Sequence, residues 1–424
     1  MADVGEEMHD IMRKLFPICR SITGAGVRQT LKIISEHVPL KIHEVPSGTA
    51  VFDWVIPPEW NISDAYIKNS LGEKLVDFKV CNLHVLNYSK PIKKKMSLQE
   101  LQGHLFTLPK YPEWIPYLTS YYGDNWGFCL KHKDYLQLKE DTYEVVIDST
   151  LEPGSLTYGE LFLPGEKQDE VLLTCYVCHP SMCNDNLSGI VLLVFLAKLL
   201  SSQKRKYSYR FLFIPETIGA ITWLAKNEGS LSKIKHGLVA TCVGGPEAFT
   251  YKKSRDENAA INSIVKKALE DLGQPYTIRD FFPTGSDERQ FCSPGFNLPV
   301  GSLLKTIYGF PEYHTSADNL DFVKPEHLDA SFKAYAEVIN ILENDFAYVS
   351  LNQKCEPHLR KRNLYRNIGG LKDDKVNDLA LLWIISMGDG NCSLLDVSLR
   401  SGFKFRDVQK AAEILLGCSL IKAK

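Results

Sequence analysis

The sequence predicts an α/β protein with a mainly parallel sheet sandwiched by helices, a small inserted β-rich domain and a C-terminal winged helix. Three observations predict this class. Strands alternate with helices between residues 140 and 348, a stretch rich in Pro, Trp and Tyr interrupts the chain before them, and three short helical segments follow residue 349. Strands alternating with helices are typical of a parallel sheet covered on both faces.

The composition excludes several classes of protein. A chain of 424 residues is too long for one ordinary core, which indicates two or three domains. Apolar residues make up 44% and charged residues 24%, as in soluble globular proteins, and the net charge of −2 provides no overall attraction to nucleic acid or membranes. The most apolar run, residues 190–200, is shorter than the roughly 18 residues of a membrane span, so we expect a buried helix there and no membrane partner.

The N-terminus and the cysteines indicate a cytoplasmic protein. The opening MADVGEEMHDIMRKLF carries acids and no long apolar run, so we expect no secretory signal. The 11 cysteines are odd in number and scattered, which favours free thiols in a reducing compartment. Cys175 and Cys178 form one CxxC inside the apolar run VLLTCYVC, where buried strand cysteines are expected rather than zinc ligands.

The chain is expected to divide into three parts. A discontinuous main domain comprises residues 1–45 and 140–348, with an insertion at 46–139 and a winged helix at 349–424. Apolar positions at helical spacing predict two helices in residues 8–38, separated by a break at 21–26. Short alternating runs such as AYIKNS and KLVDFKV, with turn residues between them, predict the β-rich insertion.

The main domain is expected to build its sheet from a regular succession of elements. We expect strands at 144–151, 157–165, 171–178, 209–215 and 237–243, and helices at 188–202, 219–230, 256–272 and 325–343. Edge strands of such a sheet can be antiparallel.

The C-terminal part has the outline of a winged helix. Helices are expected at 375–387, 393–400 and 404–416, followed by the short apolar end SLIKA. Residues 351–424 hold 13 Lys and Arg against 8 Asp and Glu, a local net charge of +5. Arg400, Lys404 and Arg406 would suit DNA, but Asp396 and Asp407 lie among them and the excess charge is modest. Protein interaction, including self-association, is therefore favoured over nucleic acid.

Four polar residues fall where ligands bind in an open α/β sheet, just beyond the carboxyl ends of the strands. They are His179 after the strand at 171–178, Asp185 before the helix at 188–202, Glu216 after the strand at 209–215, and His314 before the helix at 325–343. Imidazole and carboxylate are the usual ligands of catalytic zinc.

Each of these residues also has a structural alternative. Asp185 suits an N-cap, Glu216 suits the start of a helix, and either histidine suits a loop. For any one of these residues taken alone, the structural role is favoured at least as much as a role in a site. That all four residues lie at independent strand ends or their equivalents favours the site.

Three segments resemble the signatures of the co-catalytic zinc aminopeptidase family, which includes leucyl aminopeptidase, glutamate carboxypeptidase and glutaminyl cyclase. They are NDNLSG before a buried helix, PETIGAI after a strand, and YHTSADNLDFV before a helix. The resemblance covers about residues 1–45 and 140–345. The insertion and the winged helix resemble a bacterial aminopeptidase-like subgroup. By this resemblance His179 and His314 match zinc ligands, Asp185 matches the aspartate that bridges two metals, and Glu216 matches the general base.

The sequence departs from the family at both metal positions. Thr217 stands in place of a glutamate ligand, Cys242 in place of an aspartate ligand, and Glu288 in place of the His of a Ser-Asp-His stretch. His179, Asp185 and His314 remain, and three ligands with space for a water suit one catalytic zinc per chain. Cys242 stays open as a thiolate ligand, with a core cysteine favoured.

The resemblance implies a zinc-dependent, aminopeptidase-like hydrolase that cleaves a small peptide or amino-acid-derived substrate. Glu216 would take a proton from the attacking water. Candidates for substrate binding are Arg255, Asp287, Arg289 and Tyr313, with ordinary surface roles as the alternative. Tyr121, Tyr122 and Trp126 of the insertion are expected either to roof the site or to form a dimer surface.

Two other functions fit the same residues. One is glutaminyl-cyclase-like acyl transfer or N-deacylation at the same zinc. The other is a metal-free regulator in which the winged helix reports a bound ligand. Thr217 and Cys242 favour the regulator, whereas the four intact site residues oppose it.

Overall fold

The computed structural model describes residues 4–362, 364 and 378–424. These residues form two compact units. The first comprises the described residues within 1–261 and 276–333, and the second comprises those within 262–275 and 334–424. Each unit contains at least one sheet of its own.

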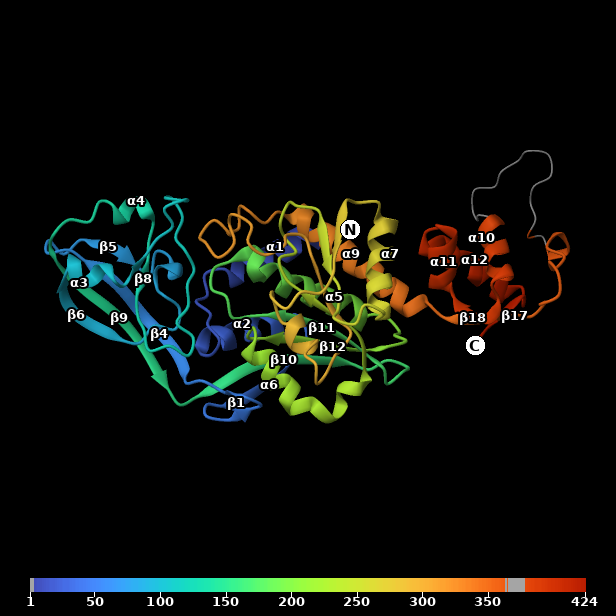
Figure 1. Ribbon diagram of the computed structural model, residues 1–424, viewed down its shortest axis with the longest axis horizontal. Coiled ribbons are helices and arrows are strands. Elements are labelled where there is room, and N and C mark those ends of the chain that lie inside the picture. Colours follow the sequence, from blue (N-terminus) through green and yellow to red (C-terminus); the bar gives the residue numbers. More distant parts are fainter. Residues whose placement is uncertain (1–3, 363, 365–377) are drawn as a thin grey trace. The chain divides into compact units, whose positions relative to one another are not determined.

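The first unit contains an eight-stranded sheet with the order β1-β10-β12-β11-β13-β16-β14-β15. Its strands β1, β10, β11 and β12 are labelled in Figure 1. The strands are β1 (Lys41–Pro46), β10 (Ser155–Leu163), β11 (Glu170–Tyr176), β12 (Ser208–Ile214), β13 (Ile234–Ala240), β14 (Phe249–Lys252), β15 (Tyr276–Arg279) and β16 (Val300–Leu304). The central strands β12, β11, β13 and β16 pair in parallel, while β1–β10, β10–β12 and β14–β16 pair antiparallel. The predicted mainly parallel sheet is confirmed.

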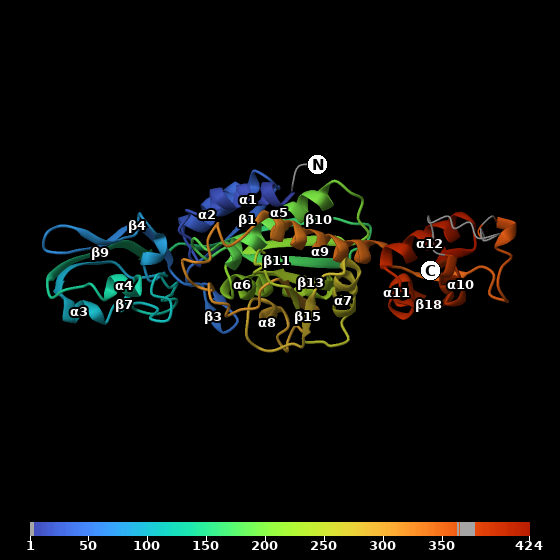
Figure 2. The ribbon, with the colours of Figure 1, turned by 90° about the horizontal axis from the view of Figure 1, so that it is seen from above.

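Helices cover both faces of this sheet. They are α1 (Val4–Leu15), α2 (Ala25–Ser35), α5 (Ser188–Ser201), α6 (Ile218–Asn227) and the short α8 (Glu288–Phe291). Two more, α7 (Ala260–Leu272) and α9 (Pro325–Asn344), begin in the first unit. Figure 2 shows α1, α2 and α5 on one face and α6 and α8 on the other.

The break between α1 and α2 has a steric cause. Gly24 adopts a φ of +100°, and a Cβ there would lie 2.0 Å from the Trp60 carbonyl oxygen. Only glycine tolerates this conformation and this close approach. The close approach therefore places Trp60 and Asn61 of the inserted domain against the start of α2.

Helix α5 is apolar on nearly every side, which is the pattern of a fully buried helix. The segment Cys183–Ser201 is one helical stretch of the described residues that is long and apolar enough to cross a membrane, yet 89% of its apolar window is buried inside the protein. The buried helix expected at 188–202 is confirmed.

The insertion forms a second sheet with the order β5-β4-β9-β6. The elements here are β2 (Ala50–Val51), β3 (Trp54–Val55), β4 (Glu59–Lys68), β5 (Lys74–Asp77), β6 (Ile92–Ser97), α3 (Leu98–Gln102), β7 (Leu105–Phe106), β8 (Phe128–Cys129), α4 (His132–Tyr135) and β9 (Thr142–Glu152). The strand expected at 144–151 as the first of the main sheet is β9, and it pairs with β4 and β6 instead. Apolar alternation predicts a strand but does not specify its partners, so this assignment was wrong.

The second unit ends in a winged helix, as expected. Its elements are β17 (Ala347–Ser350), α10 (Asp378–Ser386), β18 (Asp389–Ser393), α11 (Leu394–Ser401), α12 (Phe405–Gly417) and β19 (Ile421–Ala423), with the sheet order β18-β17-β19. Ser393 and Asp396 form a capping box that starts α11. Residues 375–377 of the helix expected at 375–387 lie outside the described residues.

Candidate metal centre

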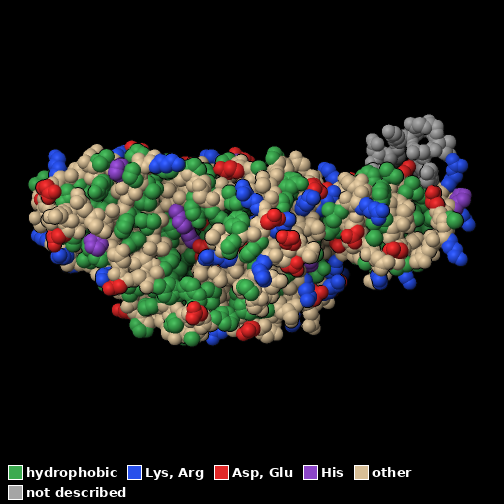
Figure 3. Space-filling model, viewed as in Figure 1, with side chains coloured by type: hydrophobic (Ala, Val, Ile, Leu, Met, Phe, Trp, Pro, Cys, Tyr) green, Lys and Arg blue, Asp and Glu red, His purple; other side chains and the backbone are tan. Residues whose placement is uncertain are grey.

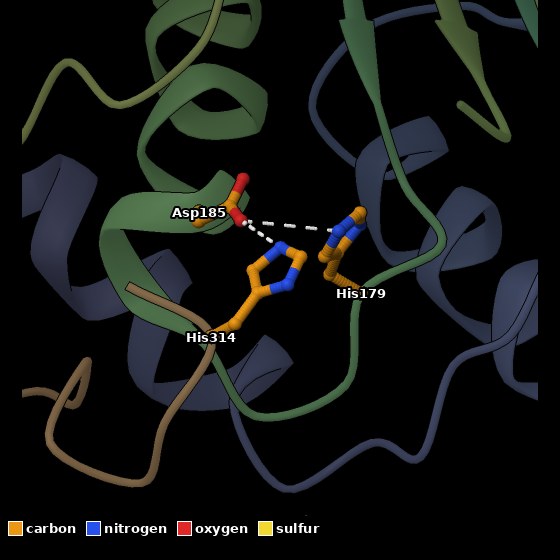
Figure 4. Close-up of side chains that lie close together, drawn as sticks. All are labelled: His179, Asp185 and His314. Carbon is orange, nitrogen blue, oxygen red and sulfur yellow. Dashed lines mark ion pairs between the residues drawn. The ribbon is translucent and has the colours of Figure 1, made fainter. Parts of the chain in front are cut away.

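Three of the four residues singled out in the sequence bring their ligand atoms to one point beyond the sheet. His179 follows β11, Asp185 lies in the turn that leads into α5, and His314 lies in the loop between β16 and α9. The three side chains point toward one another (Figure 4), and their ligand atoms all lie within 4.8 Å of one another.

The distances suit a small cation. Asp185 Oδ2 lies 3.8 Å from His179 Nε2 and 3.0 Å from His314 Nε2. Ligands of a tetrahedral zinc, each about 2.0–2.1 Å from the ion, stand roughly 3.3 Å apart. The cluster therefore needs only small side-chain adjustments to hold such an ion.

Two atoms at the centre of the cluster have few partners outside the cluster. Asp185 Oδ2 and His314 Nε2 are buried and form an ion pair with each other at 3.0 Å, but neither is assigned a hydrogen bond to any other group among the described residues. Buried polar atoms are almost always paired. Two buried ligand atoms that face each other and have no other hydrogen-bond partner among the described residues are therefore a feature expected of an ion-binding site.

The other side of Asp185 is fixed by hydrogen bonds. The Tyr176 hydroxyl donates to Asp185 Oδ1 and lies 2.7 Å from Thr241 Oγ1. Asp318 accepts hydrogen bonds from the backbone N–H groups of Asn184 (2.6 Å) and Asp185 (2.8 Å). Asp185 thus turns a single oxygen toward the histidines.

The electrostatics favour the protonation states that bind metal. Burial lowers the pKa of His179 to about 4, so its imidazole is neutral at neutral pH. Burial alone would raise the pKa of Asp185, but the rings of His179 and His314 and the Tyr176 hydroxyl hold it below its usual value. A neutral imidazole and an ionised carboxylate are the forms that coordinate a metal.

Glu216 follows β12 and lies beside the cluster, with Oε2 3.8 Å from His179 Nε2. Its side chain is 24% exposed, which is more than those of His179 and Asp185 and less than that of His314 at 35%. Burial, joined by the charges of Asp287 and Asp185, raises the pKa of Glu216 well above its usual range. A divalent cation at the cluster would oppose this rise, because it favours the ionised carboxylate.

Thr217, which stands in place of a family ligand, is held away from that role by its neighbours. Its N–H donates to Asp287 Oδ1 at 2.7 Å, and its Oγ1 accepts from Arg289 Nη2 at 3.0 Å. Cys242 is fully buried and lies outside the ligand group found among the described residues. Glu288 is also fully buried, in an ion pair of 2.6 Å with Lys252.

The four candidates for substrate binding are placed differently. Asp287 is fully buried, and Arg289 contacts Thr217 next to Glu216. The Tyr313 ring stacks on His314, with ring centroids 4.0 Å apart. Arg255 makes an exposed hydrogen bond to Asn297.

The inserted domain reaches into the site through a residue that the sequence reasoning missed. The Tyr117 ring lies 5.3 Å from the His179 ring and 5.2 Å from the His314 ring. The Tyr117 N–H donates to the His314 carbonyl at 2.7 Å, and Pro116 pairs with Thr315 in a β-bridge. The only signal in the sequence was the abundance of aromatic residues in the insertion.

The three aromatic residues named from the sequence differ in position. Tyr121 bonds the Tyr117 hydroxyl at 3.0 Å and so belongs to the roof of the site. Tyr122 is 50% exposed and packs against Trp54. The expectation for Trp126 was wrong, because its ring stacks on His104 in the core of the insertion.

An apolar cavity of about 640 Å³ adjoins this roof. Val55, Tyr88 and Tyr122 line it, and Tyr88 packs edge-on against Tyr121. Hydrophobic side chains also gather near β1 on the face shown in Figure 3.

Comparisons with known proteins agree with the fold. Residues 9–345 match the family model described as a domain of unknown function, DUF4910, and residues 347–423 match a winged helix-turn-helix. A Clostridium acetobutylicum protein is 56% identical over 421 residues, covering 99% of this chain and 97% of its own. Its name refers to polysaccharide biosynthesis and an aminopeptidase-like domain.

Solved structures with similar folds agree with these matches. A crystal structure from Clostridium acetobutylicum, described as a peptidase, has a TM-score of 0.95 at 55% identity and covers 99% of this chain and 96% of its own. A zinc aminopeptidase from Bacillus subtilis has a TM-score of 0.58 at 12% identity, covering 80% of this chain and 94% of its own. The second likeness concerns the fold alone and agrees with the fold that the motifs implied. The chain therefore belongs to the DUF4910 family, with an aminopeptidase-type fold followed by a winged helix-turn-helix.

Proposed function

We propose that this protein is a zinc-dependent hydrolase that cleaves an amide bond in a small peptide or amino-acid-derived substrate. His179, Asp185 and His314 would hold the zinc. The observation that supports this proposal is the convergence of the His179, Asp185 and His314 ligand atoms within 4.8 Å of one another, with Asp185 Oδ2 and His314 Nε2 buried and hydrogen-bonded to no other described group.

Glu216 is the proposed general base. Zinc supplies a Lewis acid that polarises a carbonyl group and acidifies water. The Glu216 carboxylate lies next to the cluster and is partly exposed, so it can accept a proton from the attacking water and return it to the leaving amine.

One zinc per chain is proposed rather than two. The Tyr176 hydroxyl occupies Asp185 Oδ1, the oxygen that a bridging aspartate would offer to a second metal. Thr217 and the buried Cys242 stand where the family has further carboxylate ligands, and Thr217 is engaged by Asp287 and Arg289. We therefore assign Cys242 to the core.

The substrate is proposed to meet Arg289 and Tyr313 first. Arg289 is a guanidinium beside Glu216, where it would hold a carboxylate or a developing oxyanion. The Tyr313 ring lies against His314 and would orient a flat or apolar group. We assign Asp287 the role of holding Thr217, and Arg255 remains a candidate contact at the surface.

The protein interactions and the location are also proposals. We propose that the winged helix or the insertion serves protein contacts or self-association. All 11 cysteines are free thiols, which supports a reducing, cytoplasmic compartment.

Metal analysis of protein purified without added metal tests the proposed centre. We expect close to one zinc per chain in the wild type and in a control variant, His132→Ala, altered in the insertion. His179→Ala and His314→Ala should lose the metal. Wild-type protein that binds no zinc even after incubation with it would overturn the proposal and favour the metal-free regulator.

N-deacylation is the second candidate, with an acylated amino sugar as substrate. The observation that favours it is the name of the 56% identical relative, which refers to polysaccharide biosynthesis. A screen of aminoacyl amides, short peptides and N-acyl amino sugars separates the two reactions, because each predicts a different released group.

A further inference from the structure

Cys178 contacts two parts of the candidate site through a single sulfur atom. It is 1% exposed and directly precedes His179. Its Sγ lies 3.3 Å from His179 Nδ1, and the backbone N–H of Glu216 donates to the same Sγ at 3.2 Å.

The sheet register explains why one sulfur meets both residues. β11 and β12 are neighbouring parallel strands in which Tyr176 is paired with Ile214, and the Val177 N–H continues the ladder to the Ile214 carbonyl. Two residues beyond each strand end, Cys178 and Glu216 come side by side. Cys178, the second cysteine of the CxxC sequence, thus lies just beyond the carboxyl ends of β11 and β12, in contact with a site residue that follows each strand.

The contact with His179 has a chemical consequence. A histidine that coordinates through Nε2 keeps its proton on Nδ1, and an acceptor at Nδ1 fixes this tautomer and the ring orientation. The usual acceptor is a carboxylate or a carbonyl oxygen. Here the atom at hydrogen-bond distance from Nδ1 is a thiol sulfur, a weak acceptor.

We propose that Cys178 is a positioning residue whose sulfur holds His179 with Nε2 toward the cluster and anchors the backbone of Glu216 beside it. The part of this proposal that concerns metal affinity rests on the proposed zinc function. The part that concerns the His179 tautomer does not, because it applies to the metal-free protein as well.

The test compares Cys178→Ala, Cys178→Ser and a matched control, Cys175→Ser. Serine keeps an acceptor at position 178 and alanine removes it. Cys175 is a buried thiol three residues earlier on β11, so its variant reports the general cost of changing a core cysteine on this strand.

Two measurements on the full chain are needed. Nitrogen-15 NMR of histidine-labelled, metal-free protein reads the His179 tautomer, with His179→Gln used to assign the signal. Competition with a chelator gives the zinc dissociation constant. We expect the Nδ1–H tautomer in the wild type, Cys178→Ser and Cys175→Ser, and a shift of the population toward Nε2–H in Cys178→Ala.

Zinc affinity should follow the tautomer. Loss of an outer-shell acceptor typically weakens metal binding by about 10–100-fold, which we expect for Cys178→Ala but not for Cys178→Ser or Cys175→Ser. Wild-type protein with the Nε2–H tautomer would overturn the proposal without any variant. So would a folded Cys178→Ala that keeps both the tautomer and the affinity of the wild type. If the wild type binds no zinc, the proposed function fails, while the tautomer still decides the role of Cys178.

Discussion

At the scale of single residues, hydrogen bonds to individual atoms decide what Asp185 offers to a ligand. Tyr176 holds Oδ1 and Asp318 holds the preceding backbone, so Oδ2 alone is left at the cluster. The sequence predicted the four central residues because each follows a strand or precedes a helix. It did not predict Tyr176, Cys178 or Asp318 in supporting roles, because those contacts depend on strand register and loop packing.

Replacing Tyr176 by Phe should weaken zinc binding about 10-fold or more, because Asp185 loses the donor that fixes its orientation. The zinc dissociation constant, measured by chelator competition, checks this. Tyr158→Phe is the control, since Tyr158 is equally buried on β10 of the same sheet, which is separated from β11 by β12. Equal affinity in the two variants would show that the hydroxyl of Tyr176 does not orient Asp185.

Glu216→Gln should lower kcat by about 10²–10⁴-fold, since the amide cannot take a proton from water. Zinc content should stay at the wild-type level, because Glu216 is assigned no ligand role. Glu228→Gln, an exposed glutamate beyond the end of α6, is the control. Full activity of Glu216→Gln on a substrate found in the screen would refute the base assignment.

At the scale of elements, the strands were easier to predict than their partners. Apolar runs predicted β10, β11, β12 and β13, and the order of strands and helices predicted that the central strands are parallel. β9 has the same kind of apolar run but belongs to the inserted sheet. Pairing is a long-range property, so a single strand's pattern does not contain it.

His236 on β13 should make the first unit sensitive to acid. It is 8% exposed, and burial together with Lys206 lowers its pKa to about 4. The unfolded chain protonates this histidine near pH 6.5, whereas the folded chain does so only near pH 4. Between these values the unfolded state binds more protons, so stability falls as the pH falls.

Replacing His236 by Phe should remove the part of the stability loss at low pH that is caused by this histidine. Relative to wild type, the variant's free energy of unfolding should rise by about 2 kcal/mol between pH 7.5 and pH 5. Urea unfolding of chelator-treated protein gives the free energy of unfolding of both proteins at each pH. The difference between variant and wild type at pH 7.5 is subtracted from the difference at pH 5. A difference independent of pH would mean that His236 is protonated equally in both states.

At the scale of the whole molecule, contacts at the start of α12 within the second unit argue against DNA binding by the winged helix. The Phe405 N–H at the start of α12 donates to Asp271 at 2.7 Å. Arg406 bonds Glu337 at 2.6 and 2.8 Å. The carboxylates of Asp271 and Glu337 thus contact the first two residues of α12, the helix that would enter the major groove of DNA in this class of domain.

We therefore expect no specific DNA binding. The full chain should bind a mixed-sequence duplex of about 25 base pairs no more tightly than about 10⁻⁴ M at physiological salt, the weak end of non-specific binding. Fluorescence anisotropy at two salt concentrations measures this. Micromolar affinity with a steep salt dependence would instead assign the domain to nucleic acid.

The β-bridge between Pro116 and Thr315 joins two distant segments of the chain, which determines when the candidate metal centre can form during synthesis. Ile115 and Ser316, which bond each other across this bridge, are 201 residues apart in the chain. At about 5–20 residues per second, a ribosome needs roughly 10–40 s to make that stretch. The inserted domain is therefore synthesised well before the loop that carries His314 exists. The three residues proposed to hold zinc can come together only once that loop has left the ribosome, so the proposed centre forms late in translation.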